Sequence, residues 1–84
     1  MVTRDFSGDD IAKTLVNEDN FAWVRTTGGH MILRWEPPED HDTEPRTVSV
    51  PRHDRVREGT LRDIAEQAGA QDFDEFCKWI DRNR

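Results

Sequence analysis

A histidine that follows two consecutive glycines is the first feature of this chain that could do chemistry: His30 comes directly after Gly28 and Gly29. The imidazole of histidine titrates near neutral pH, so it can take a proton from a hydroxyl group or donate one to a leaving oxygen. The glycines would let backbone N–H groups approach a negatively charged substrate. A lone histidine in a strand is more often structural than catalytic, so this chemistry requires further support from the sequence.

Arginines near this histidine and farther along the chain could hold a phosphate group. From Arg46 to Arg62 the chain has five arginines against two carboxylates, Asp54 and Glu58. A planar guanidinium can bind two phosphate oxygens at once. The candidate phosphate-binding residues are therefore Arg25, Arg34, Arg52, Arg57 and Arg62. The alternative is that these arginines only form a solvated surface.

Three further features have both a chemical and a structural interpretation. Gly59 and Thr60 could bind a phosphate at the beginning of a helix, or they could simply start that helix. His53 is a secondary candidate, but it follows a proline by two positions and we expect it to organise the turn before the helix. We expect no metal site, because the chain's potential ligands lack the close spacing that metal ligands usually have; they are His30, His41, His53 and Cys77.

Length and charge limit what the chain can be. With 84 residues we expect a single domain, 1–84, that has a shallow site and no enclosed cofactor. The net charge of −6 argues against a simple basic nucleic-acid binder, so contacts with a polyanion would be confined to local arginine clusters. The composition is acidic and has only two lysines, Lys13 and Lys78, which makes it similar to that of halophilic proteins.

The single cysteine and the lack of a long apolar segment indicate the compartment in which the protein works. Cys77 is the single cysteine, so an intramolecular disulfide is excluded. The first residues lack the apolar segment of a signal peptide, and no stretch has the length of a membrane span. We therefore expect a cytoplasmic protein that has no association with a membrane.

Capping residues predict three helices. Ser7 is expected to cap a first helix, which has apolar residues on one side. Thr60 is expected to cap a second helix that runs through Ala68, with Gly69 in the left-handed conformation that ends a helix. Asp72 is expected to cap a third helix, because a glutamate follows it three positions later.

Three apolar or aromatic segments between the first two helices predict strands, at residues 21–25, 30–36 and 47–50. Proline ends the second and third of them. The predicted order is α-β-β-β-α-α. This is an α+β fold in which helices cover one face of a three-stranded antiparallel sheet, as in double-stranded-RNA-binding domains.

A hairpin turn at Gly28-Gly29 would pair Thr27 with His30 and so decide which side chains share a face of the sheet. The face toward the helices would then carry Ala22, Val24, Met31, Leu33 and Trp35, joined by Val48 and Val50. The open face would carry Phe21, Trp23, Arg25, His30, Ile32 and Arg34. Aromatic, arginine and histidine side chains together suit contact with RNA or with a protein, although the aromatic rings could also simply cover one another.

The second half of the chain contains the most specific motifs: V-P-R-H at 50–53, G-T-L-R-D-I at 59–64 and Q-A-G at 67–69. Their order and spacing resemble the HicA (YcfA-like) family, whose members have V-P-x-H, G-T-L-R-x-I and Q-A-G. The segment from Gly28 to His30 is similar to the family's G-S-H, which contains the catalytic histidine. The chain has Gly29 where family members usually have serine. The resemblance spans nearly the whole chain.

The resemblance implies the toxin of a type II toxin–antitoxin pair, a metal-independent mRNA endonuclease that is neutralised by a HicB-like antitoxin. His30 would be the catalytic residue. One positioned acid or base contributes about 10²- to 10⁴-fold, so we expect a slow enzyme. The partners would be mRNA and the antitoxin, without a membrane or a small-molecule cofactor. We expect the RNA to contact Arg25, Gly28, Gly29, Arg34, Arg52, Arg57, Thr60 and Arg62.

Two alternatives belong to other functional classes. The chain could be an RNA-binding module that has the fold but does not cleave RNA. It could also be a protein-interaction domain that docks another chain through the face that carries Trp23, Ile32 and Arg34. The three hypotheses differ in whether replacement of His30 abolishes cleavage of RNA.

Overall fold

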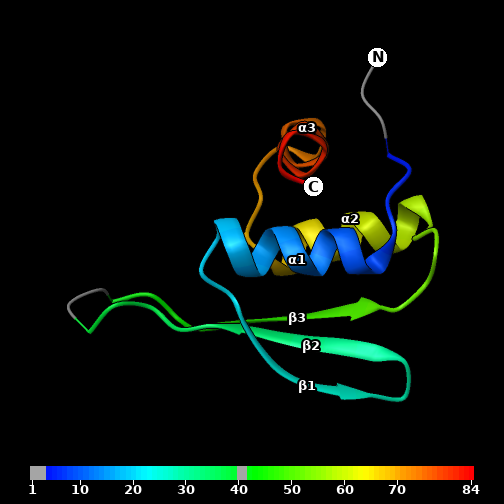
Figure 1. The fold of residues 1–84 in the computed structure, drawn as a ribbon. Coiled ribbons are helices and arrows are strands. Elements are labelled where there is room, and N and C mark those ends of the chain that lie inside the picture. Colours follow the sequence, from blue (N-terminus) through cyan, green and yellow to red (C-terminus); the bar gives the residue numbers. More distant parts are fainter. Residues whose placement is uncertain (1–3, 40–41) are drawn as a thin grey trace.

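The computed structural model describes residues 4–39 and 42–84, which form one sheet covered on one face by three helices (Figure 1). In chain order the elements are α1 (Gly8–Glu18), β1 (Ala22–Thr27), β2 (His30–Trp35), β3 (Arg46–Pro51), α2 (Glu58–Gln67) and α3 (Phe73–Asn83). The strands are antiparallel, in the order β1-β2-β3. This confirms the predicted α+β fold and its α-β-β-β-α-α order, the arrangement of double-stranded-RNA-binding domains.

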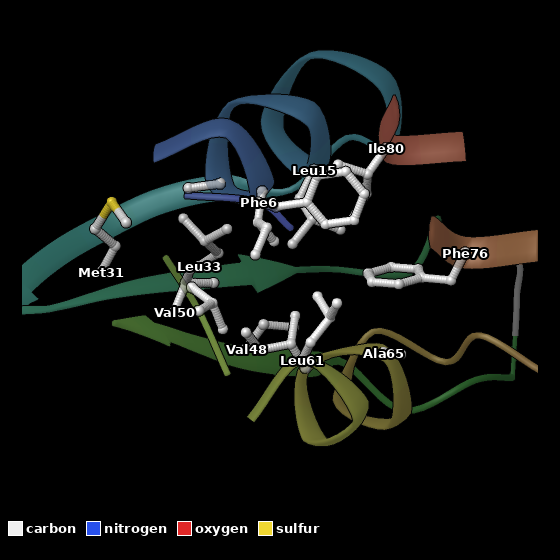
Figure 2. Close-up of a cluster of buried hydrophobic side chains, with 14 of the residues drawn as sticks. Phe6, Leu15, Met31, Leu33, Val48, Val50, Leu61, Ala65, Phe76 and Ile80 are labelled. Carbon is white, nitrogen blue, oxygen red and sulfur yellow. The ribbon is translucent and has the colours of Figure 1, made fainter. Parts of the chain in front are cut away.

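The core lies between the helices and one face of the sheet. The helices α1 and α2 pack on the strands, and α3 packs on α1 and α2 (Figure 1). Apolar side chains from both layers meet there, among them Phe6, Leu15, Leu61 and Ile80 (Figure 2). Four residues predicted to face the helices are fully buried, which confirms that prediction for them; they are Met31, Leu33, Val48 and Val50.

The beginning of α1 is fastened to the end of β3. The Ser7 hydroxyl accepts a hydrogen bond from the Asp10 N–H at 3.1 Å, which confirms the predicted cap. The Gly8 N–H donates to the carbonyl oxygen of His53 at 2.9 Å. A Cβ atom on Gly8 would lie only 1.9 Å from the carbonyl oxygen of Pro51, so no side chain fits between the helix and the strand.

Helix α2 begins three residues earlier than predicted. The N-cap is Arg57, whose carbonyl oxygen accepts from the Leu61 N–H at 2.8 Å, and Thr60 lies within the first turn instead of capping it. The prediction for Thr60 as a cap is therefore wrong. Glu58 fits the first turn because its carboxylate favours the positive end of the helix dipole. The predicted left-handed Gly69 is confirmed by its φ of +85°.

Two side-chain hydrogen bonds fix the remaining parts of the helical layer. Asp72 caps α3 as predicted, because its Oδ1 accepts from the Glu75 N–H at 3.0 Å. Gln67, at the end of α2, accepts from the Ser49 N–H through Oε1 at 3.1 Å. This second bond joins α2 to the outer edge of β3.

The segment between Trp35 and Arg46 connects β2 to β3, and His41, which falls in it, lies outside the described residues. Strand β2 ends at Trp35, one residue before the predicted end. Within the described parts of the chain, no helix is both long enough and apolar enough to cross a membrane.

A β-bulge in β1 changes the predicted face of several side chains. The pairs Thr27–His30 and Arg25–Ile32 form as predicted, but the register then shifts, so that Trp23 pairs with Leu33 instead of Arg34. Val24 is the additional residue. A bulge adds one residue to one strand, so alternation is reversed beyond it.

The predictions for four residues at this end of β1 are therefore wrong. Trp23 lies on the side of the sheet that faces the helices, and its Nε1 donates to Thr26 Oγ1 at 3.0 Å. Ala22 pairs with Arg34 and is exposed, and Val24 is 50% exposed, so neither belongs to the core. Phe21, expected on the open face, is 3% exposed and belongs to the core.

Candidate functional site on the open sheet face

His30 is the first residue of β2 and its side chain is exposed. The two residues before it have positive φ angles, +57° for Gly28 and +80° for Gly29, as a type I′ hairpin turn requires. Its backbone is paired on both sides, with Thr27 of β1 and Pro51 of β3. A fixed backbone therefore presents a solvent-accessible imidazole beside a turn that has no side chains.

Three other predicted residues share the open face with His30. Ile32 and Arg34 follow it at alternate positions of β2, and Arg25 pairs with Ile32 across β1. Arg25 is the diagonal neighbour of His30, a relation in which side chains lie about 7–8 Å apart and long side chains can meet. His30 and Arg25 therefore share one face of the sheet, as the predicted pairing requires.

The two arginines of this face differ in their surroundings. Arg25 forms no ion pair with any carboxylate of residues 4–39 and 42–84. Arg34 donates through Nε to Glu36 and through Nη1 to Thr47 Oγ1, the latter at 3.3 Å. The guanidinium of Arg25 is therefore free to bind an anion, whereas Arg34 would first have to exchange its bond to Glu36.

Arg52 lies beside the turn but on the other side of the sheet. Its N–H donates to the Gly29 carbonyl oxygen at 2.8 Å, which extends the pairing of β2 and β3 by one residue. Its guanidinium is directed toward α1, where Nε lies 3.6 Å from Oδ1 of Asp9. The backbone of Arg52 therefore supports the turn before His30, while its charge belongs to the surface around α1.

The other predicted phosphate-binding residues belong to α2, on the covered side of the sheet. Arg62 lies 4.2 Å from the centre of the Phe73 ring and 3.7 Å from a carboxylate oxygen of Glu58, so it joins α2 to α3. Thr60 is half-buried in the first turn of α2, and Arg57 is exposed at its N-cap. The structure does not bring these three residues to the face that carries His30.

His53 has a structural contact through its backbone. Its carbonyl oxygen accepts a hydrogen bond from the Gly8 N–H at the beginning of α1, while its side chain is exposed. Three residues later, the N–H of Val56 donates to the carbonyl oxygen of Phe6 at 2.8 Å. These bonds agree with the expectation that His53 organises the segment before α2.

Other groups that could do chemistry lie in less suitable places. Cys77 is fully buried, and burial raises the pKa of its thiol, so the nucleophilic thiolate is disfavoured. In the parts of the chain that the structure describes, no three histidine, cysteine, aspartate or glutamate side chains gather as metal ligands would.

Two clefts were not predicted from the sequence. The first, of about 430 Å³, lies between α1 and β1 and includes Trp23, whose position depends on the bulge. The second, of about 500 Å³, lies between the end of α1 and α3, and acidic side chains with Phe76 and Trp79 line it. Beside the second cleft, burial raises the pKa of Asp19 and the charge of Arg46 opposes this shift. No short-range sequence pattern indicated either cleft, because each joins segments that are separated in the chain.

Comparison with known proteins relates this geometry to one family. The model of the family described as the HicA toxin of bacterial toxin–antitoxin systems matches residues 8–70, from the first residue of α1 to just beyond α2. The match includes His30, the hairpin turn and the arginines discussed above. No curated protein and no solved structure matches the chain.

Proposed function

The chain belongs to the HicA toxin family of bacterial toxin–antitoxin systems, and from this premise we propose that it is an endoribonuclease that cleaves mRNA without a metal ion. The observation that carries the proposal is the exposed His30 beside the glycine turn, with Arg25 as its diagonal neighbour on the open face. A general base and a cation close to each other are what cleavage of a phosphodiester needs.

In the proposed reaction, the His30 imidazole takes the proton of a ribose 2′-hydroxyl. The 2′-oxygen attacks the adjacent phosphorus, the bond to the 5′-oxygen breaks, and the products are a 2′,3′-cyclic phosphate and a 5′-hydroxyl. The leaving oxygen takes its proton from water. Negative charge that develops on the phosphate oxygens is stabilised by the guanidinium of Arg25.

The glycine turn leaves the backbone beside His30 accessible to the substrate. Neither Gly28 nor Gly29 has a side chain, and a Cβ atom at either position would meet nothing within 4 Å, so the space beside His30 is open. A phosphodiester can therefore approach the backbone at the start of β2. The charge of −6 on the chain disfavours broad contact with RNA, which supports short contacts at local clusters of basic residues.

We propose that the antitoxin is a HicB-like protein that covers the open face and so prevents RNA from reaching His30. The open face is accessible from one side because all three helices lie on the other (Figure 1). A toxin that acts on mRNA works where mRNA is translated, so we place it in the cytoplasm.

A His30→Ala variant tests the proposal. The exposed side chain makes no buried contact, so the variant should keep its fold by circular dichroism, while cleavage of a single-stranded RNA falls about 10²- to 10⁴-fold and growth arrest in cells is lost. The variant should still bind RNA and the antitoxin. Equal toxicity of variant and wild type would show that His30 is not the catalytic residue and would favour a non-cleaving RNA-binding module or a protein-interaction domain.

A further inference from the structure

A groove of about 430 Å³ lies between α1 and β1, on the side of the sheet opposite to His30. This volume is within the range of pockets that bind small organic groups. The groove is distinct from the proposed catalytic face because it borders a helix, whereas that face has none. Its lining consists of Asp9, Lys13, Val16, Asn17, Trp23 and Arg52.

Trp23 is the aromatic side chain of the groove and its ring is fixed. The indole Nε1 donates to Thr26 Oγ1 at 3.0 Å, and 49% of the residue remains exposed. The bulge at Val24 is what places the ring on this side of the sheet. An oriented, half-exposed indole ring is suited to stacking against a flat group.

The charges of the groove favour an anionic ligand. Lys13 forms no ion pair with the described carboxylates, and Arg52 reaches Asp9 only at 3.6 Å. Two cations thus face one carboxylate, in a chain whose net charge is −6. Asn17 adds an amide that can both donate and accept hydrogen bonds at the edge of a base. An aromatic platform with cations beside it is the combination that binds single-stranded nucleic acid.

We propose that this groove binds one nucleobase of a single-stranded RNA, which stacks on Trp23 while Lys13 and Arg52 hold the neighbouring phosphates. The inference rests on the proposed ribonuclease function and adds a second contact to it. Arg52 connects the two sites, because its N–H is bonded to the Gly29 carbonyl oxygen in the turn before His30. The groove and the face that carries His30 therefore adjoin the same hairpin turn.

The test measures affinity for a labelled single-stranded oligoribonucleotide, with His30→Ala as the parent so that the RNA stays intact. Trp23→Leu keeps apolar bulk but removes the stacking surface, and should weaken binding about 5- to 150-fold. Trp23→Phe keeps an aromatic ring and should stay within about threefold of the parent. Melting of each variant by circular dichroism shows whether the fold is retained.

The proposed contact of Lys13 with a phosphate has a matched control, because the other lysine of the chain, Lys78, lies away from the groove. Lys13→Gln should reduce the slope of log affinity against log salt by about 0.7, the effect of one phosphate contact on a single strand. Lys78→Gln changes a lysine of α3 that lies 3.4 Å from Glu75, away from the groove, and should leave the slope unchanged.

The possible failures are distinguishable. If the folded Trp23→Leu variant binds RNA as the parent does, the groove is not a base site, while His30-dependent cleavage by the wild type would still stand. If the change weakens binding of the antitoxin and leaves RNA affinity unchanged, the groove is a protein contact and the inference is overturned. Absence of RNA binding by the parent also overturns it, and absence of cleavage by the wild type refutes the proposed function itself.

Discussion

Replacement of Gly8 by alanine is expected to destabilise the protein, although the same change inside a helix usually stabilises by about 0.5–1 kcal/mol. The added Cβ would lie 1.9 Å from the carbonyl oxygen of Pro51, about half of a normal contact distance. The carbonyl oxygen belongs to the backbone and a Cβ atom is fixed to its own Cα, so neither can rotate away and the beginning of α1 must move away from β3. Overpacking of this kind costs about 1–3 kcal/mol.

The movement would also strain a hydrogen bond. The Gly8 N–H donates to the His53 carbonyl oxygen at 2.9 Å, and its loss costs about 0.5–1.5 kcal/mol. Together with the gain in helix propensity, the net loss in free energy of unfolding is about 2 kcal/mol. For a chain of this size that corresponds to a decrease in Tm of about 8–16 °C.

The assay is thermal and urea denaturation followed by circular dichroism, with Gly59→Ala as the matched control. Gly59 also lies in the first turn of a helix, but a Cβ atom there would meet nothing within 4 Å. The control should be as stable as wild type or gain up to about 1 kcal/mol. If Gly8→Ala melts at or above the temperature of wild type, the close packing of α1 on β3 is not as described.

Three further predictions concern the site, the turn and the core. Arg25→Ala should lower the rate of RNA cleavage about 10²- to 10³-fold. Arg82→Ala, which changes an arginine in the last turn of α3, is the control and should leave the rate unchanged. Equal rates for both variants in the same assay would exclude Arg25 from charge stabilisation. Gly29 has a φ of +80°, so Gly29→Ala should lower the free energy of unfolding by about 1–2 kcal/mol in urea denaturation. Gly28→Asn should leave it nearly unchanged, because asparagine is favoured at the first position of a type I′ turn. An unchanged free energy of unfolding for Gly29→Ala would contradict the assigned turn. Burial raises the pKa of the Cys77 thiol, so above about pH 8.5 the unfolded chain loses a proton that the native state keeps, and the free energy of unfolding falls as the pH rises. Cys77→Ala should therefore make the Tm depend less on pH above about pH 8.5. An unchanged dependence of Tm on pH would show that the thiol does not contribute.

The hairpin shows how far local sequence rules reach. Two glycines require a tight turn, and a tight turn fixes the pairing next to it, so the positions of His30 and Arg25 follow from the sequence. The error begins at Val24, three residues before the end of β1. Trp23 and Val24 are both apolar, so alternation gives no sign of which of them faces the helices or that a bulge separates the two registers.

The arginines between 46 and 62 show a second limit. Closeness in sequence indicated one phosphate-binding segment, but the segment turns from a strand into a helix and its side chains diverge. Arg52 is directed toward α1, while Arg62 lies on the Phe73 ring of α3. The start of α2 was misplaced for a related reason. Thr60 is a strong capping residue, yet burial of Leu61 and Ile64 is also satisfied by a helix that starts at Glu58 without a side-chain cap.

Each edge of the sheet has one feature that hinders the addition of another strand. On one edge, the bulge at Val24 interrupts the regular spacing of donors and acceptors that another strand would need. On the other, the Gln67 side chain already occupies the Ser49 N–H. Growth of the sheet from one molecule to the next, as in amyloid fibrils, is therefore hindered at both ends.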